Sequence, residues 1–110
     1  MSFREKIKNK ILKDRISSSL PPPSYIKDLE NYIYACMFNF AYLPNIPKTR
    51  LKITSNIENY LLLLELQGYI RDFKVICDDS NNIDFAVQYN IQVYFTDVLT
   101  DKKYMLDVKF

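Results

Sequence analysis

The sequence predicts an α+β domain in which two or three helices pack on a small, mostly antiparallel sheet. Two stretches carry apolar residues at three- and four-residue spacing, the period of a helix with one buried face. Three later stretches alternate apolar and polar residues, which is the period of a strand. With 110 residues, the chain is long enough for one domain with a modest core of its own.

The first 15 residues predict a basic arm. They hold six lysines and arginines against two acidic residues, whereas the rest of the chain holds nine against eleven. Phe3, Ile7 and Ile11 lie at helical spacing among these charges, which predicts an amphipathic helix that needs a surface to dock on. Three consecutive prolines then predict an extended linker. We therefore divide the chain into an arm with its linker, 1–23, and a domain, 24–110.

The first helix of the domain is predicted to begin at Ser24, a residue type that often caps helix N-termini. Its apolar residues recur at helical spacing and are Tyr25, Ile26, Leu29, Ile33, Met37 and Phe40. We expect this helix to end before Pro44, because the residue before a proline disfavours helical backbone. A short loop, 43–48, then leads into the central helix.

The central helix has one apolar face, formed by Ile53, Ile57, Tyr60, Leu61 and Leu64. We favour Thr49 as its N-cap, and a capping box of Ser55 and Glu58 is the alternative. Gly68 is the only glycine of the chain, and we expect it to stop the helix with a positive φ. Residues 60–64 are apolar on nearly all sides, which predicts packing against more than one neighbour, other subunits among them.

The predicted strands follow the glycine. Residues 70–77 form the first strand, and five consecutive turn-forming residues come after it. Phe85, Val87 and Tyr89 alternate, Asn90 is a possible bend, and the main second strand is placed at 91–97, antiparallel to the first.

A turn at 101–103 leads to the last predicted strand. Its apolar residues alternate to the end of the chain and are Tyr104, Leu106, Val108 and Phe110. This strand can fold back as the third strand of its own sheet or be donated to a neighbour. Two or three short strands leave open sheet edges, and open edges recruit further strands.

One pattern runs through residues 25–110, and its densest part reads G-x-I-x-D-F-x-V-x-C-D-x-x-N-N. Its members are Pro44, Asn45, Thr49, Arg50, Gly68, Asp72, Phe73, Cys77, Asp78, Asn81 and Asn82. The pattern resembles the C-terminal domain of contractile phage tail sheath proteins. In that family, neighbouring subunits donate terminal arms to one another's sheets. The resemblance therefore implies a structural virion protein of a contractile injection system, located in the tail and assembled in the host cytoplasm.

The resemblance also implies the partners and the interfaces. The partners are other copies of the chain or other tail proteins of the sheath, tube, baseplate or neck. Strand exchange would use Tyr104, Leu106, Val108 and Phe110, and arm docking would use Phe3, Ile7 and Ile11. Sheath subunits are normally several times longer than this chain, and the sheath initiator of contractile baseplates is a small protein that resembles the same domain. A baseplate or neck component that initiates or caps the sheath is therefore the alternative.

Composition argues against an enzyme. The chain has no histidine, the commonest general base and zinc ligand, and a single glycine excludes Gly-rich phosphate loops. Asp78, Asp79 and Asp84 lack the ordered spacing of a calcium loop, and we expect a solvated turn. Cys36 and Cys77 are expected to be buried free thiols. We expect no cofactor, no metal and no small-molecule substrate.

A small nucleic-acid-binding protein is the alternative from another class, because the basic arm suits phosphates. We consider it less favoured, since the body offers no basic face to extend the contact. The longest apolar run is too short to span a bilayer, and no signal peptide is recognised, so we expect a soluble intracellular protein without membrane contact.

Overall fold

Two helices pack on a three-stranded antiparallel sheet in the computed structural model, which describes residues 23–110, so the predicted α+β class is confirmed. The elements are α2 (Ser24–Phe38), α3 (Pro47–Leu66), β1 (Ile70–Ile76), β2 (Asn90–Asp97) and β3 (Lys103–Lys109). The predicted helix of the basic arm, with Phe3, Ile7 and Ile11, lies outside the described residues.

The chain divides into two compact units, and the boundary between Tyr32 and Ile33 falls within α2. The first part of α2 belongs to the first unit and buries Tyr25, Ile26 and Leu29. The rest of α2 belongs to the second unit, together with α3 and the sheet.

Helix α3 begins earlier than predicted. Ile46, with extended backbone, occupies the N-cap position and makes no side-chain cap, and Pro47 is the first helical residue. Proline suits this position because its φ is preset for a helix and the N–H that it lacks would have no partner there. Thr49 and Ser55 therefore lie inside the helix, and both predicted N-caps are wrong.

The C-terminal end of α3 is as predicted. Gly68 has a φ of +83°, directly after the cap residue Gln67. The N–H of Tyr69 donates to the carbonyl of Leu64, and the N–H of Gly68 donates to the carbonyl of Glu65. These two bonds form a Schellman motif, which requires a positive φ at the glycine and turns the chain directly into β1.

One face of α3 forms the core of the second unit. Ile53, Ile57, Leu61 and Leu64 are buried. Leu62 and Leu63 are 44% and 55% exposed, so the apolar run 60–64 is covered on one face only within the described chain.

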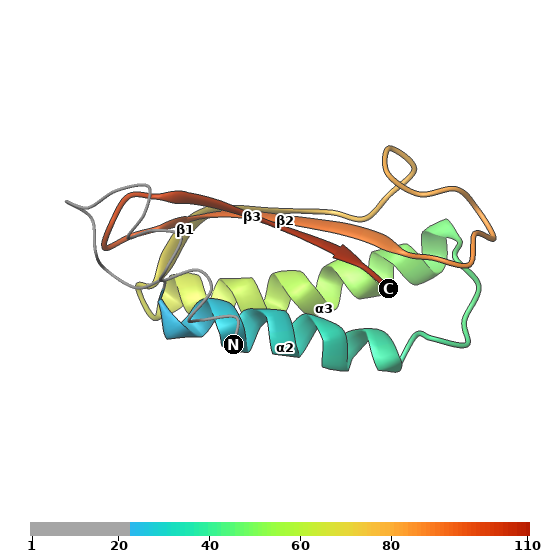
Figure 1. Cartoon of the computed structure of the whole chain (residues 1–110), viewed down its shortest axis with the longest axis horizontal. Helices are drawn as coiled ribbons and strands as arrows, with labels where there is room; N and C mark the ends of the chain where they lie inside the picture. Colours follow the sequence, from blue (N-terminus) through green and yellow to red (C-terminus); the bar gives the residue numbers. More distant parts are fainter. Residues whose placement is uncertain (1–22) are drawn as a thin grey trace, which may run out of the picture. The chain divides into compact units, whose positions relative to one another are not determined.

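Strand β2 is the centre of the sheet, with order β1-β2-β3. Its Ile91, Val93 and Phe95 side chains are buried, and Figure 1 shows the three strands as one layer with α3 in a second layer along it. The pairing of β1 with β2 shifts register between Arg71 and Lys74, a bulge at which Asp72 has a φ of +54°.

Strand β3 pairs with β2 of the same chain in unbroken register, from Thr96 opposite Lys103 to Asn90 opposite Lys109. The turn before it lies at 98–102, slightly earlier than predicted. There the backbone N–H and hydroxyl of Thr100 donate to the carboxylate of Asp97.

The alternation of Phe85, Val87 and Tyr89 does not produce a strand. Phe85 has a φ of +64°, outside the region that strands occupy, and Phe85 and Val87 are exposed. Only Tyr89 is buried, and its backbone exchanges two hydrogen bonds with Phe110 beyond the end of β3.

Candidate functional site

Arg50 lies in the first turns of α3 and is fully buried, with 1% of its side chain exposed. One terminal nitrogen donates to the side-chain oxygen of Asn45 at 2.8 Å. The other donates to Asp79 at 2.5 Å and Asp84 at 2.9 Å. We call these four residues the Arg50 cluster. It ties the loop before α3 to the long connection between β1 and β2.

Three asparagines continue this network. Asn45 donates to the side-chain oxygen of Asn82 at 3.3 Å and to the carbonyl of Gln88 at 3.0 Å. Asn82 donates to the carbonyl of Asn90 at 2.9 Å and accepts from its N–H at 2.8 Å. Asn81 donates to the carbonyl of Ile76 at 2.9 Å. The polar residues of the sequence pattern thus fix a connection that has no strand or helix of its own to satisfy its backbone groups.

Hydrogen bonds favour the charged forms of Arg50 and Asp78. Burial opposes the charge of Arg50, but hydrogen bonds to Asp84 and Asp79 raise the pKa of its guanidinium above the ordinary value. Hydrogen bonds from the hydroxyl and N–H of Ser80 hold the pKa of Asp78 below its usual range. Two carboxylates bond the guanidinium and a third, Asp78, precedes Asp79 in the chain, so the negative charges of these side chains outnumber the one positive charge.

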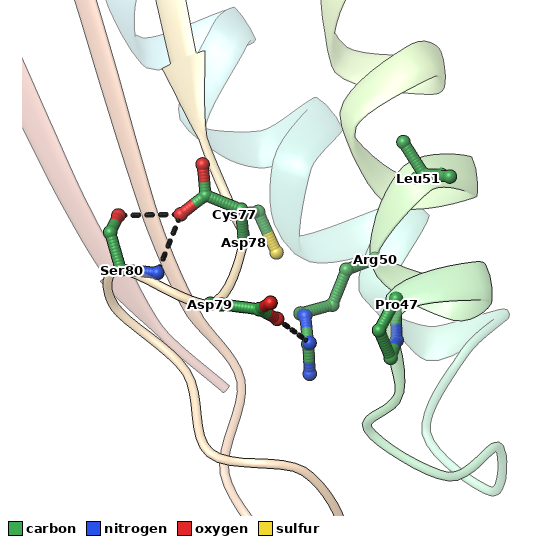
Figure 2. Close-up of a pocket in the computed structure, with 7 residues that line it drawn as sticks. All are labelled: Pro47, Arg50, Leu51, Cys77, Asp78, Asp79 and Ser80. Carbon is green, nitrogen blue, oxygen red and sulfur yellow. Dashed lines mark hydrogen bonds and ion pairs between the residues drawn. The ribbon is translucent and has the colours of Figure 1, made fainter.

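A pocket of about 420 Å³ opens beside the Arg50 cluster. Figure 2 shows Pro47 and Leu51 of α3 on one side and the segment of Cys77, Asp78 and Asp79 on the other, with the Arg50 guanidinium pointing toward Asp79. Its walls combine apolar atoms with an acidic rim.

This pocket lacks an activated nucleophile. Cys77 lines it, but burial raises the pKa of its thiol to about 11, so the thiol is protonated at neutral pH. Cys36 is also a buried free thiol, as the sequence predicts for both cysteines. Across residues 23–110, no group of three or more His, Cys, Asp or Glu side chains is placed to hold a metal ion. Asp79 and Asp84 bind Arg50 instead.

The other residues of the sequence pattern lie apart from this pocket. Pro44 is exposed in the loop before α3. Thr49, the residue before Arg50, is buried. Gly68 ends α3, and Asp72 and Phe73 form the bulge of β1. The pattern therefore combines backbone positions at element ends with one polar cluster.

Three of the predicted exchange residues lie in β3, Phe110 follows its end, and the four differ in burial. Val108 is 3% exposed, whereas Tyr104, Leu106 and Phe110 are half-buried. The ring of Tyr104 stacks on Phe95 with centroids 5.4 Å apart. The ring of Phe110 meets Phe38 edge-on at 5.3 Å. The rings of Tyr104 and Phe110 therefore both contact aromatic side chains of the same unit.

The two edges of the sheet differ. Strands β1 and β3 are the outer strands, so each has one edge without a strand partner among the residues that the structure describes. The β1 edge is interrupted by the bulge at Asp72, and bulges obstruct further pairing. The β3 strand is regular along its whole length. Of the two outer strands, β3 therefore has the more regular pairing.

The sequence did not predict that residues 83–87 form a loop with exposed apolar side chains. Ile83, Phe85 and Val87 are 79%, 75% and 101% exposed. The sequence offers no clear signal for this surface, because turn-forming residues precede strands as often as loops.

Comparison of the chain with protein-family models, with curated proteins and with solved structures gave no match. Neither α2 nor α3 has the length and apolar character needed to cross a membrane.

Proposed function

We propose that this chain is a structural subunit of a contractile tail, a sheath or sheath-like protein of the virion, and that it assembles by exchanging β3 with neighbouring subunits. The resemblance of its sequence pattern to sheath C-terminal domains supports the class of protein. The placement of β3 supports the mode of assembly.

The observation that carries the proposal is the shallow anchoring of β3. Only Val108 of its seven residues is buried, whereas five residues of β2 are buried. Most of what β3 contributes is backbone pairing, and the β2 strand of a neighbour offers the same pairing partners. Exchange therefore replaces nearly every contact that it breaks, while it links two chains mechanically.

A cross-linking experiment tests the exchange. Tyr94 and Met105 are opposite each other in the β2–β3 register, and both are exposed. One full-length chain carries Tyr94→Cys and a second carries Met105→Cys, and the two are mixed under oxidising conditions. Exchange predicts a disulfide between the two different chains, because the donated β3 brings one cysteine opposite the other.

The matched control replaces Met105→Cys by Leu99→Cys, an exposed position in the turn that has no β2 partner in the register. The native thiols are buried and need not be removed. Cross-linking that is equal for the Met105 and Leu99 variants reflects random collision and would refute strand exchange.

A further inference from the structure

The loop 83–87 carries an unusual combination of exposure and strain. Ile83, Phe85 and Val87 present large apolar side chains to solvent. Phe85 also adopts a φ of +64°, a conformation that a bulky side chain rarely occupies. Neither feature stabilises the fold of the chain itself. Exposed apolar groups held in a strained conformation are typical of a binding surface.

The loop is held in this shape by the core. The N–H of Phe85 donates to the carbonyl of Asn45 at 2.7 Å. The neighbouring Asp84 accepts a hydrogen bond from buried Arg50, and the amide of Asn45 donates to the carbonyl of Gln88. These bonds fix both ends of the loop, so its apolar side chains are presented in advance of binding.

The pocket beside the loop adds negative charge to the same surface. Asp84 separates Ile83 from Phe85 in sequence and shares the guanidinium of Arg50 with Asp79, which lines the pocket. The side chains of Asp79 and Asp84 are 82% and 55% exposed. Leu51 of α3 adds an apolar wall that is 71% exposed. A partner must therefore supply apolar groups and positive charge together.

The N-terminal arm has this chemistry. Its sequence spaces Phe3, Ile7 and Ile11 four residues apart and surrounds them with six lysines and arginines. Lysine and arginine also cover apolar surface with their stems while their charged groups reach acidic partners. We propose that the loop 83–87 and the adjacent pocket form the receptor for residues 1–15 of a second copy of this chain.

The second copy follows from the proposed function, on which this inference rests. In an assembly, the arm of one subunit meets the body of the next, and the two carry opposite net charges. Nucleic acid is disfavoured at this surface, because the carboxylates of Asp78, Asp79 and Asp84 repel phosphates.

A labelled peptide of residues 1–15 tests the receptor by fluorescence anisotropy. The titrant is the full-length chain with Lys6→Glu, Lys8→Glu and Lys10→Glu, so that its own arm does not compete. We expect saturable binding that weakens with added salt.

Phe85→Asn should weaken binding at least tenfold while leaving Tm unchanged or higher, because asparagine tolerates a positive φ. The double variant Ile83→Ser, Val87→Ser should weaken it similarly.

Leu99→Ser is the matched control, because Leu99 is an equally exposed apolar residue in another turn, and it should bind as the parent does. Binding that is absent, or equally strong in the Phe85 and Leu99 variants, would overturn the proposal. The proposal would also be overturned if the wild-type chain were monomeric in sedimentation and did not bind the peptide. The receptor would then be filled by the arm of the same chain.

The cross-linking experiment on Tyr94 and Met105 tests β3 exchange independently of the arm receptor. A cross-link without peptide binding would refute this receptor alone. Peptide binding without a cross-link would refute β3 exchange and leave the receptor in place.

Discussion

At the residue scale, Arg50 combines burial, charge and four hydrogen-bond acceptors. Its guanidinium bonds the side chain and carbonyl of Asn45 with one nitrogen and two carboxylates with the other. Only a planar fork reaches acceptors in these separate directions, which is why lysine is not equivalent here. The residue holds the connection between β1 and β2 at the N-terminal end of α3.

Arg50→Lys should therefore lower the free energy of unfolding by about 2 to 4 kcal/mol, because the side-chain oxygen of buried Asn45 loses the donor that Arg50 supplies. Urea denaturation of the full chain measures this change. Asp79→Asn is the matched variant and should cost under about 1 kcal/mol, since Asp79 is 82% exposed and its ion pair is screened by water. Similar losses for the two variants would show that the cluster does not depend on the buried guanidinium.

Gly68 provides a second test at this scale. A Cβ added at this position meets no atom within 4 Å, so the cost of a substitution comes chiefly from the backbone conformation. With a φ of +83°, Gly68→Val should destabilise the fold by about 1 to 3 kcal/mol and Gly68→Asn by clearly less. Thermal unfolding compares the two, and equal effects would exclude backbone strain as the cause.

Cys77 should react slowly in the native protein. Burial raises the pKa of its thiol to about 11, so the thiolate that attacks an alkylating reagent is scarce at pH 8. Raising the pH toward 11 increases the thiolate fraction and should increase the rate of iodoacetamide modification, followed by mass spectrometry. Denatured protein serves as the fast reference. Equal rates at pH 8 in native and denatured protein would contradict the burial of this thiol.

At the scale of elements, β3 is anchored by one deeply buried side chain. Val108 is 3% exposed, whereas Leu106, two residues earlier and on the same face of the strand, is half-buried. We expect Val108→Ala to cost about 1 to 3 kcal/mol and Leu106→Ala under about 1 kcal/mol in chemical denaturation. If Leu106→Ala were the costlier change, β3 would be held by contacts that the single chain lacks, and those contacts would come from a neighbour.

At the scale of the whole molecule, the proposed assembly requires that β3 leave its own sheet and pair with a neighbour. The double variant Tyr94→Cys, Met105→Cys places two cysteines opposite each other in one chain. All chains in this test also carry Lys6→Glu, Lys8→Glu and Lys10→Glu, which removes association through the arm. Once oxidised within a chain, the double variant cannot release β3, so it should remain monomeric by light scattering and should assemble again after reduction. Oxidised Tyr94→Cys alone is the control. A locked chain that assembles as well as the control would show that association uses another surface.

The sequence predicted the elements whose formation is local. The helical spacing of Ile53, Ile57, Leu61 and Leu64 and the alternation around Val93 identify buried faces before any partner is known. Gly68 was predictable as a helix stop, because a positive φ is a property of one residue. The prediction of Thr49 as the N-cap was wrong, because the helix begins at Pro47 and Thr49 is a buried residue inside it.

Only the tertiary structure decided what the polar residues do. Asn45, Arg50, Asp79 and Asp84 are up to 39 residues apart in sequence, and no local rule states that one guanidinium will join them. The same holds for Phe85, whose alternation with Val87 suggests a strand until the bond to Asn45 fixes its backbone in the left-handed region. Periodicity reports which side chains leave water, whereas the pairing of buried charges and the shape of an irregular loop depend on groups that folding brings together.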